Sequence, residues 1–389
     1  MSYPPISETA LNTLIKGNAY EPYYSYKSPI DLYDIHQFTN GQPFNAYDEL
    51  RENSPIYFQN PPEWDVEPGA WMLTSYKDIM EVSSNPAIYS SQAATGNLMT
   101  LGNPETRHPK LWQTSIDHML NLDGSFHLDL RREHMPFFKP GYVDELHKKV
   151  EIKVEVLLDA IAKVGKSNLV KDLSQQIPIF TLSEVLGIPE EDRHKLSTWM
   201  EFLELAQYFA AEGMKKTQGK TEEMEVDTSM IELFENMIGE MFEYGKHILQ
   251  EKRLNPKNDL LSAIANAELG GAKLSQEYLD GSWLLIIFAG NDTTRNSISG
   301  AIKLLTEFPE QKKKLLNNLD LLPNFAQETI RMVSPVIHMR RTTTCETTLG
   351  NQKLGKGEKV IMWYGAANRD PSIFSNPNAF DIERENAVK

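Results

Sequence analysis

A run of polar residues follows the most apolar helical stretch of the chain. Residues 283–289 are apolar on every face, which indicates a buried helix. The next residues are Gly290, Asn291, Asp292 and Thr293, and burying a carboxylate without a partner is costly. Glycine would let a flat ligand approach the backbone, and Thr293 could bond to a carbonyl one turn earlier, leaving room for water. The pattern predicts a ligand site.

The same pattern also fits a core helix whose polar patch faces another helix. Asp292 would then be bridged to Arg295 or to a more distant base. Leu285, Ala289 and Thr293 follow at intervals of four residues, so they share one face of a helix. Both interpretations remain open on the pattern alone.

Two other pairs of polar residues have helical spacing. Glu328 and Arg331 are three residues apart, and His127 and Arg131 are four apart, so each pair lies on one helix face. A pair of this kind is most often an ordinary helix contact. Spacing by itself therefore assigns neither pair a function.

Helices are expected to position these residues, because helical periodicity dominates the chain. The predicted helices cover residues 37–53, 76–84, 141–164, 173–186, 190–212, 229–252, 259–269, 276–307, 309–317 and 322–332. Strands are expected at 56–58, 71–74, 342–349 and 359–363. The sequence thus predicts a mainly α fold with a small β-sheet that joins early and late segments. No convincing linker appears, since residues 214–227 fit a surface loop, and residues 1–389 are expected to form a single domain.

Composition narrows the class of protein. A net charge of −15 argues against a nucleic-acid binder, because phosphate backbones select basic surfaces. Cys345 is the one cysteine, so no intramolecular disulfide is possible. The N-terminus lacks the pattern of a signal peptide, and no apolar run approaches the roughly 20 residues of a membrane-spanning helix. We expect a soluble, cytoplasmic protein without membrane contact.

Several motifs in the same order resemble those of the cytochromes P450, of the soluble bacterial type. The central-helix signature corresponds to Ala-Gly-Asn-Asp-Thr-Thr-Arg at 289–295, and the Glu-x-x-Arg motif to 328–331. The further matches are 122–132, 340–344, 367–371 and 380–384. The first of these departs from the family by having Gly124 and Ser125 where two prolines are usual, which changes the entry into the helix.

The resemblance implies roles for individual residues. Asp292 and Thr293 would deliver protons to dioxygen so that its O–O bond breaks heterolytically. Propionates of haem b would be bound by His127, Arg131 and Arg341, although the adjacent Arg340 leaves a one-residue ambiguity. Ala289 and Gly290 would contact the haem, and a structural ion-pair triad would be formed by Glu328, Arg331 and Arg384. The substrate pocket would be lined by Leu285, Phe288, Val336 and Ile337, with parts of 97–119 and 199–209.

The family's haem ligand has no counterpart in this sequence. That ligand is a cysteine in a glycine-rich loop shortly after the segment that in this chain ends at Arg384, whereas the chain ends at Lys389. Cys345 is not a substitute, because it lies in the expected strand after Arg341 at a position that the family fills with small polar or acidic residues. We interpret the chain as a fragment of a P450 rather than as a naturally truncated, haemless protein, because a haemless protein has no use for the propionate and proton-delivery motifs. The haem loop and the following helix would be missing from the fragment, and these residues alone are expected to be inactive.

The resemblance implies a haem-thiolate monooxygenase that hydroxylates a hydrophobic small molecule similar to a steroid, branched lipid or terpenoid. Oxygen would come from O₂, and electrons from a ferredoxin or flavodoxin with its reductase. The protein is expected to be a monomer. The alternative is a haemless P450-like protein that binds a hydrophobic molecule without catalysis.

Overall fold

The computed structural model describes residues 30–38, 40–60, 69–92, 109–114, 118–203, 228–385 and 387. The chain forms two compact units. Of the described residues, those between 109 and 295 belong to unit 1, and those between 30 and 92 and between 296 and 387 belong to unit 2. Among the described helices, none is both long and apolar enough to cross a bilayer.

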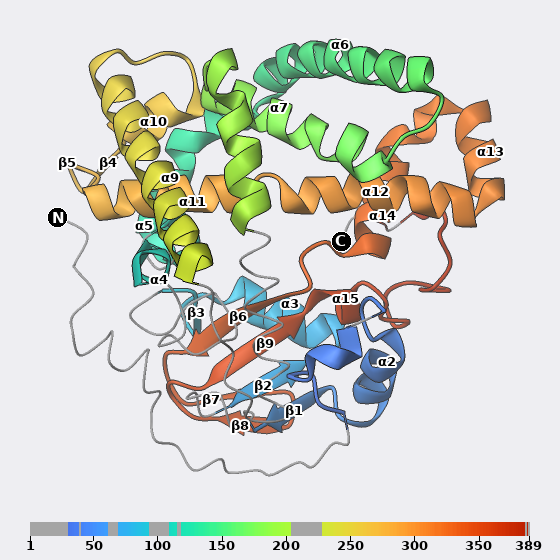
Figure 1. The fold of residues 1–389 in the computed structure, drawn as a ribbon. Coiled ribbons are helices and arrows are strands. Elements are labelled where there is room, and N and C mark those ends of the chain that lie inside the picture. Colours follow the sequence, from blue (N-terminus) through green and yellow to red (C-terminus); the bar gives the residue numbers. More distant parts are fainter. Residues whose placement is uncertain are drawn as a thin grey trace. The chain divides into compact units, whose positions relative to one another are not determined.

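Unit 1 is almost entirely helical (Figure 1). Its elements are α4 (Pro109–Thr114), η3 (Met119–Asn121), α5 (Gly124–His134), η4 (Met135–Phe138), α6 (Pro140–Val164), the π-helical η5 (Val170–Ser174), α7 (Gln176–Leu186), η6 (Glu190–Asp192), a helix over 193–203, α9 (Thr228–Leu254), α10 (Leu260–Asn266), the hairpin β4 (Glu268–Leu269) and β5 (Ala272–Lys273), and α11 (Gln276–Ala289). The first residues of α12 (Asp292–Glu307) complete it.

One apolar cluster holds unit 1 together. It joins residues of α5, α7, α9, α10 and α11, with Trp199 and Trp283 among its largest buried side chains. The Trp283 indole N–H donates to the Met241 carbonyl at 2.9 Å, so α11 is fixed against α9 by a polar contact as well as by packing. Gly245 faces this indole closely, since a Cβ there would come within 2.4 Å of it.

Unit 2 is built on a five-stranded sheet of order β1-β2-β9-β6-β3 (Figure 1). The strands are β1 (Ile56–Gln59), β2 (Ala70–Leu73), β3 (Tyr89–Ser90), β6 (His338–Thr343) and β9 (Lys359–Trp363), and β7 (Thr347–Leu349) pairs with β8 (Gln352–Leu354). Its helical elements are η1 (Ile35–Phe38), α2 (Phe44–Asn53), α3 (Tyr76–Ser84), most of α12, α13 (Pro309–Asn317), η7 (Leu319–Leu321), α14 (Leu322–Val333) and α15 (Tyr364–Ala367). The parallel pairing of β2 with β9 confirms the predicted junction of early and late segments.

Helices cover both faces of this sheet. Tyr57, Met72 and Ile361 pack in the cluster that includes α2, whereas residues on the other face, such as Leu73 and Met362, pack in the cluster that includes α3. Successive strand residues point to opposite faces, so β1, β2 and β9 are buried along their whole length.

Several predicted boundaries are wrong for local reasons. The helix expected over 37–53 begins at Phe44 because Pro43 restricts the preceding turn. The helix expected over 259–269 ends at Asn266, and residues 268–273 turn through Gly270 and Gly271, both at positive φ, into a hairpin. The strand expected over 342–349 is two strands, separated by a bend at 344–346 that contains Cys345. Residues 204–212 and 214–227 lie outside the described part of the chain.

Candidate functional site

The predicted continuous helix over 276–307 is two helices. α11 ends at Ala289 and α12 begins at Asp292, with Gly290 and Asn291 in a turn between them. The Thr293 hydroxyl lies 3.4 Å from the Ala289 carbonyl, the backward contact that the sequence suggested. A glycine weakens a helix and a threonine hydroxyl competes for its carbonyls, so the polar signature interrupts the helix.

The interruption presents an acid and an alcohol side by side. Asp292 forms an ion pair with Arg295, three residues along α12, as the alternative interpretation of the pattern suggested. The Asp292 side chain remains 50% exposed, whereas the Arg295 side chain is 13% exposed. The carboxylate is therefore held by an ion pair and reachable by water, and the contact with water allows it to exchange protons with the solvent.

Gly290 has a packing role that the sequence did not indicate. A Cβ at this position would lie 2.9 Å from Leu182 of α7 and from the Ile286 carbonyl. Leu182 thus occupies the space that a side chain would need, and any larger residue would force the end of the Leu182 side chain to move. Ala289 and Phe288, by contrast, are exposed.

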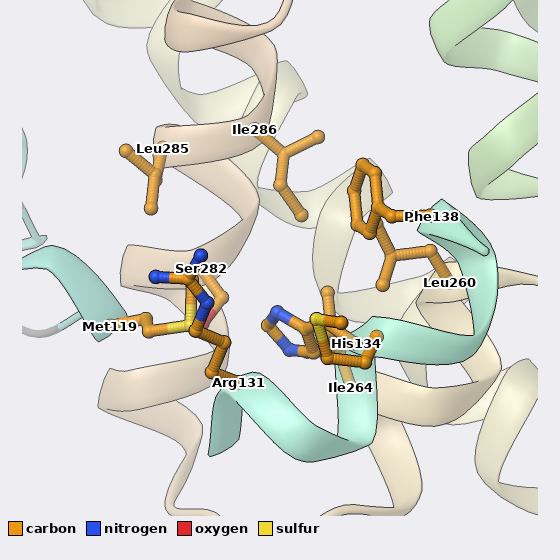
Figure 2. Close-up of a pocket in the computed structure, with 10 residues that line it drawn as sticks. Met119, Arg131, His134, Phe138, Leu260, Ile264, Ser282, Leu285 and Ile286 are labelled. Atoms are coloured by element: carbon orange, nitrogen blue, oxygen red, sulfur yellow. The ribbon is translucent and has the colours of Figure 1, made fainter. Parts of the chain in front are cut away.

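A pocket of about 470 Å³ lies within unit 1 (Figure 2). Leu285 and Ile286 of α11 line it, opposite Arg131 and His134 of α5. The other lining residues are Met119, Met135, Phe138, Leu260, Ile264 and Ser282. The lining is apolar apart from two bases and a hydroxyl, so the pocket suits a ligand with an apolar body and an anionic group.

His127 and Arg131 lie one turn apart on α5, as predicted. Burial and the neighbouring Arg131 cation lower the pKa of His127, so its neutral form is favoured. Within the described ranges, neither side chain has a hydrogen bond or an ion pair. A ligand carboxylate fits beside these two bases, because it can accept a hydrogen bond from each and would oppose the effect of the Arg131 cation on His127.

His134 is a pocket residue that the sequence did not reveal. Burial lowers its pKa to about 4, so the imidazole is neutral at physiological pH. Its spacing of three residues from Arg131 was a usable signal, because residues at i and i+3 share a helix face. Which face of α5 meets α10 and α11 depends on tertiary packing, and the spacing does not indicate it.

In unit 2 the structure brings Glu328, Arg331 and Arg384 together. Arg331 forms two 2.7 Å bonds with the Glu328 carboxylate, and Arg384 Nε lies 3.0 and 3.1 Å from its two oxygens. All three side chains are buried. Arg384 also donates to the carbonyls of Ser375 and Ala379, so this triad anchors the late irregular segment to α14.

The remaining predicted residues of unit 2 lie on or before β6. Arg340 is buried, whereas Arg341 is half-buried and donates to the Arg340 carbonyl at 2.8 Å. Val336 is half-buried and Ile337 is 38% exposed. Of the ranges expected to line a substrate pocket, 97–108, 115–117 and 204–209 lie outside the described residues.

Comparisons with known proteins agree on one family. The model described as Cytochrome P450 matches residues 88–386. Linalool 8-monooxygenase of Pseudomonas putida is 30% identical over 91% of this chain and 83% of its own length. The steroid C26-monooxygenase of Rhodococcus jostii is 27% identical over 92% of this chain and 71% of its own length. A solved Mycobacterium marinum cytochrome P450 in complex with pseudoionone is 28% identical, with a TM-score of 0.78 over 93% of this chain and 86% of that one.

Proposed function

The chain belongs to the cytochrome P450 family, and from this premise we propose that it hydroxylates a hydrophobic small molecule with O₂. Its mainly helical fold with a small sheet is the fold of solved P450s. The observation that carries the proposal is the helix interruption, which presents Asp292 and Thr293 together at one open turn. We also propose that residues 1–389 belong to a single P450 domain.

Haem b is the cofactor of this family and therefore of this protein, and when bound it supplies the activation of O₂. We propose that His127 and Arg131 hold one propionate, since both bases lie unpaired on one face of α5 among the described residues. Arg341 would hold a propionate through its half-buried guanidinium. Ala289 and the Gly290 backbone would contact the porphyrin.

Asp292 and Thr293 would move protons. Asp292 is half-exposed, so its carboxylate can take up a proton from water while Arg295 keeps it in place. The Thr293 hydroxyl makes a long 3.4 Å contact with the Ala289 carbonyl, and such a contact is readily exchanged for a stronger one. Thr293 Oγ1 would pass the proton on, and the surrounding apolar residues would limit the access of bulk water.

The substrate class rests on the relatives and on the lining. Linalool, steroids and methyl-branched lipids appear in the names of the curated relatives. The proposed contacts Leu285 and Phe288 in unit 1, and Val336 and Ile337 in unit 2, are all apolar. We therefore infer a terpenoid, steroid or branched-lipid substrate. Electrons would come from a ferredoxin or flavodoxin.

We further propose that Cys345 is not the haem ligand. It is exposed in the bend between β6 and β7 of unit 2, and it is the one cysteine of the sequence. Residues 1–389 alone should then bind haem without the thiolate signature and should not turn over. A longer chain that supplies the thiolate should show the long-wavelength Soret band of a ferrous–CO thiolate haem.

The test combines the ferrous–CO spectrum with a substitution at Thr293. In a longer chain that supplies the thiolate, Thr293→Ala should uncouple NAD(P)H consumption from product formation, whereas Thr294→Ala, at the adjacent threonine, should leave coupling unchanged. Folded, haem-loaded protein without the long-wavelength band would defeat the monooxygenase proposal and favour a non-catalytic binding protein. Unchanged coupling in Thr293→Ala would remove this residue from the relay.

A further inference from the structure

Asn291 is a buried amide in the turn between α11 and α12. Its side chain is 2% exposed. Among the residues that the structure describes, neither its Oδ1 nor its Nδ2 has a hydrogen-bond partner. A buried amide with no partner is rare in native proteins, and an ordered water is a common explanation.

The burial pattern places this amide on the core side of the central segment. Leu284, Ile287 and Asn291 are spaced as one helix stripe and are all buried, and the first two belong to the apolar cluster of unit 1. Phe288 and Ala289 are exposed, and Thr293 follows Ala289 at the spacing of one turn. Asn291 therefore points away from the face that carries Thr293.

The backbone at the same turn has free polar groups. The helical hydrogen-bond ladder of α11 ends with the 3.1 Å bond from Gly290 N to the Ile286 carbonyl. The ladder resumes in α12 with the 2.9 Å bond from Arg295 N to the Asn291 carbonyl. Between them, within the described chain, the Asn291 N–H makes no bond to the Ile287 carbonyl. An amide side chain and an unused backbone donor and acceptor thus lie within one turn of chain. Together they can satisfy the two to four contacts that a buried water makes.

We propose that Asn291 is a positioning residue that binds a buried water on the core side of the interruption. The water and the amide together keep the turn open, so that Asp292 and Thr293 stay at an interrupted turn rather than in a continuous helix. An apolar residue at this position would remove the polar anchor, and the ladder from residue 287 to residue 294 could close. The role in proton delivery rests on the proposed monooxygenase function, whereas the water site does not.

Hydrogen exchange of the backbone tests the proposal on the chain as it stands. Asn291→Leu replaces both polar atoms by methyl groups in a side chain with the same branching, and it should let the helical hydrogen-bond ladder close. Exchange of the amides of residues 291 and 294 should then slow by roughly fivefold, the effect of a newly formed backbone hydrogen bond. Ile287→Val, an apolar change on the same buried stripe, should not slow them. Unchanged exchange in Asn291→Leu, or equal slowing in both variants, would overturn the proposal.

A second measurement does not depend on the variant's folding. An atomic-resolution structure of the wild-type chain should show an ordered water within hydrogen-bond distance of the Asn291 amide. A dry site or a direct protein partner there would overturn the proposal. In haem-loaded enzyme with its thiolate, Asn291→Leu should increase uncoupling and the solvent isotope effect while leaving the substrate-induced spectral shift intact. If the long-wavelength Soret band is absent, the proposed function fails, but the exchange and water measurements still decide the role of Asn291.

Discussion

The two bases on α5 illustrate how single residues adjust each other's charge. His127 is partly buried, and burial already favours its neutral imidazole. The Arg131 cation one turn away lowers the pKa of His127 further. A bound carboxylate would reverse that effect, because it stabilises the imidazolium. Binding of such a ligand should then be accompanied by proton uptake.

We predict that Arg131→Leu raises the pKa of His127. The shift should be partial, because the contribution of burial remains when the cation is removed. NMR titration of the imidazole measures it directly. Arg132→Leu is the matched control, since Arg132 is exposed and pairs with Asp129 instead. A pKa of His127 that stays the same in Arg131→Leu would show that the two side chains do not interact.

Pairs of neighbouring side chains could be predicted from the sequence where both residues lie on one helix. The spacing of His127 with Arg131 and of Glu328 with Arg331 needed only the helix periodicity. The burial of Asn291 and the position of His134 depend on which face packs against other helices. The reason for Gly290 is likewise tertiary, because Leu182 of α7 lies far away in the sequence.

At the scale of elements, some helix boundaries that a local cap or breaker sets were predicted well. α13 has the predicted bounds 309–317, and α7 ends before Gly187 as expected. The division of the central segment into α11 and α12 was not predicted, although its causes were identified. Helix periodicity continues through residues 290–291, so the pattern alone does not indicate whether the weakened turn opens.

Two glycines that end helices differ in how closely other atoms pack around them, although both have a left-handed backbone. Gly165 after α6 and Gly187 after α7 both have positive φ, at 76° and 65°. A Cβ at Gly165 would meet nothing within 4 Å, whereas at Gly187 it would lie 2.3 Å from an oxygen of Asp259. That carboxylate is buried in an ion pair with Lys252 and cannot move freely.

We therefore predict that Gly187→Ala destabilises the chain more than Gly165→Ala. Backbone strain in the left-handed region alone should lower the free energy of unfolding by about 1 kcal/mol in Gly165→Ala. In Gly187→Ala the displaced ion pair should bring the loss to about 3–5 kcal/mol. Denaturant unfolding of both variants gives the comparison, and equal losses would mean that Asp259 relaxes without cost.

The triad links α14 to the late irregular segment of unit 2, so its carboxylate should be essential there. Glu328→Gln would leave two buried guanidiniums without an anion and should cost about 3–5 kcal/mol of unfolding free energy. Asp129→Asn removes the carboxylate of an exposed pair and should cost less than about 0.5 kcal/mol. Similar losses in the two variants would show that the buried network contributes no more than a surface pair.

At the scale of the whole molecule, both units contain an imidazole that burial keeps neutral. Burial lowers the pKa of His134 in unit 1 and of His338 in unit 2 to about 4. Both histidines titrate near pH 6.5 in an unfolded chain. Between pH 6.5 and 4 the unfolded chain therefore binds more protons than the folded one. Stability must fall as the pH falls through this range.

His338→Phe should reduce that acid sensitivity. The imidazole of His338 lies edge-on to Trp363, with ring centroids 4.7 Å apart, and a phenyl ring can preserve this contact without taking up a proton. Between pH 7 and pH 4 the free energy of unfolding should fall by about 2–3 kcal/mol more in the wild type than in the variant. Each unit of pKa shift corresponds to about 1.4 kcal/mol of this free energy. Urea unfolding at several pH values measures the difference. His147→Gln, at an exposed histidine, should leave the wild-type pH dependence unchanged. If His338→Phe loses as much stability as the wild type on acidification, protonation of His338 does not contribute to acid unfolding.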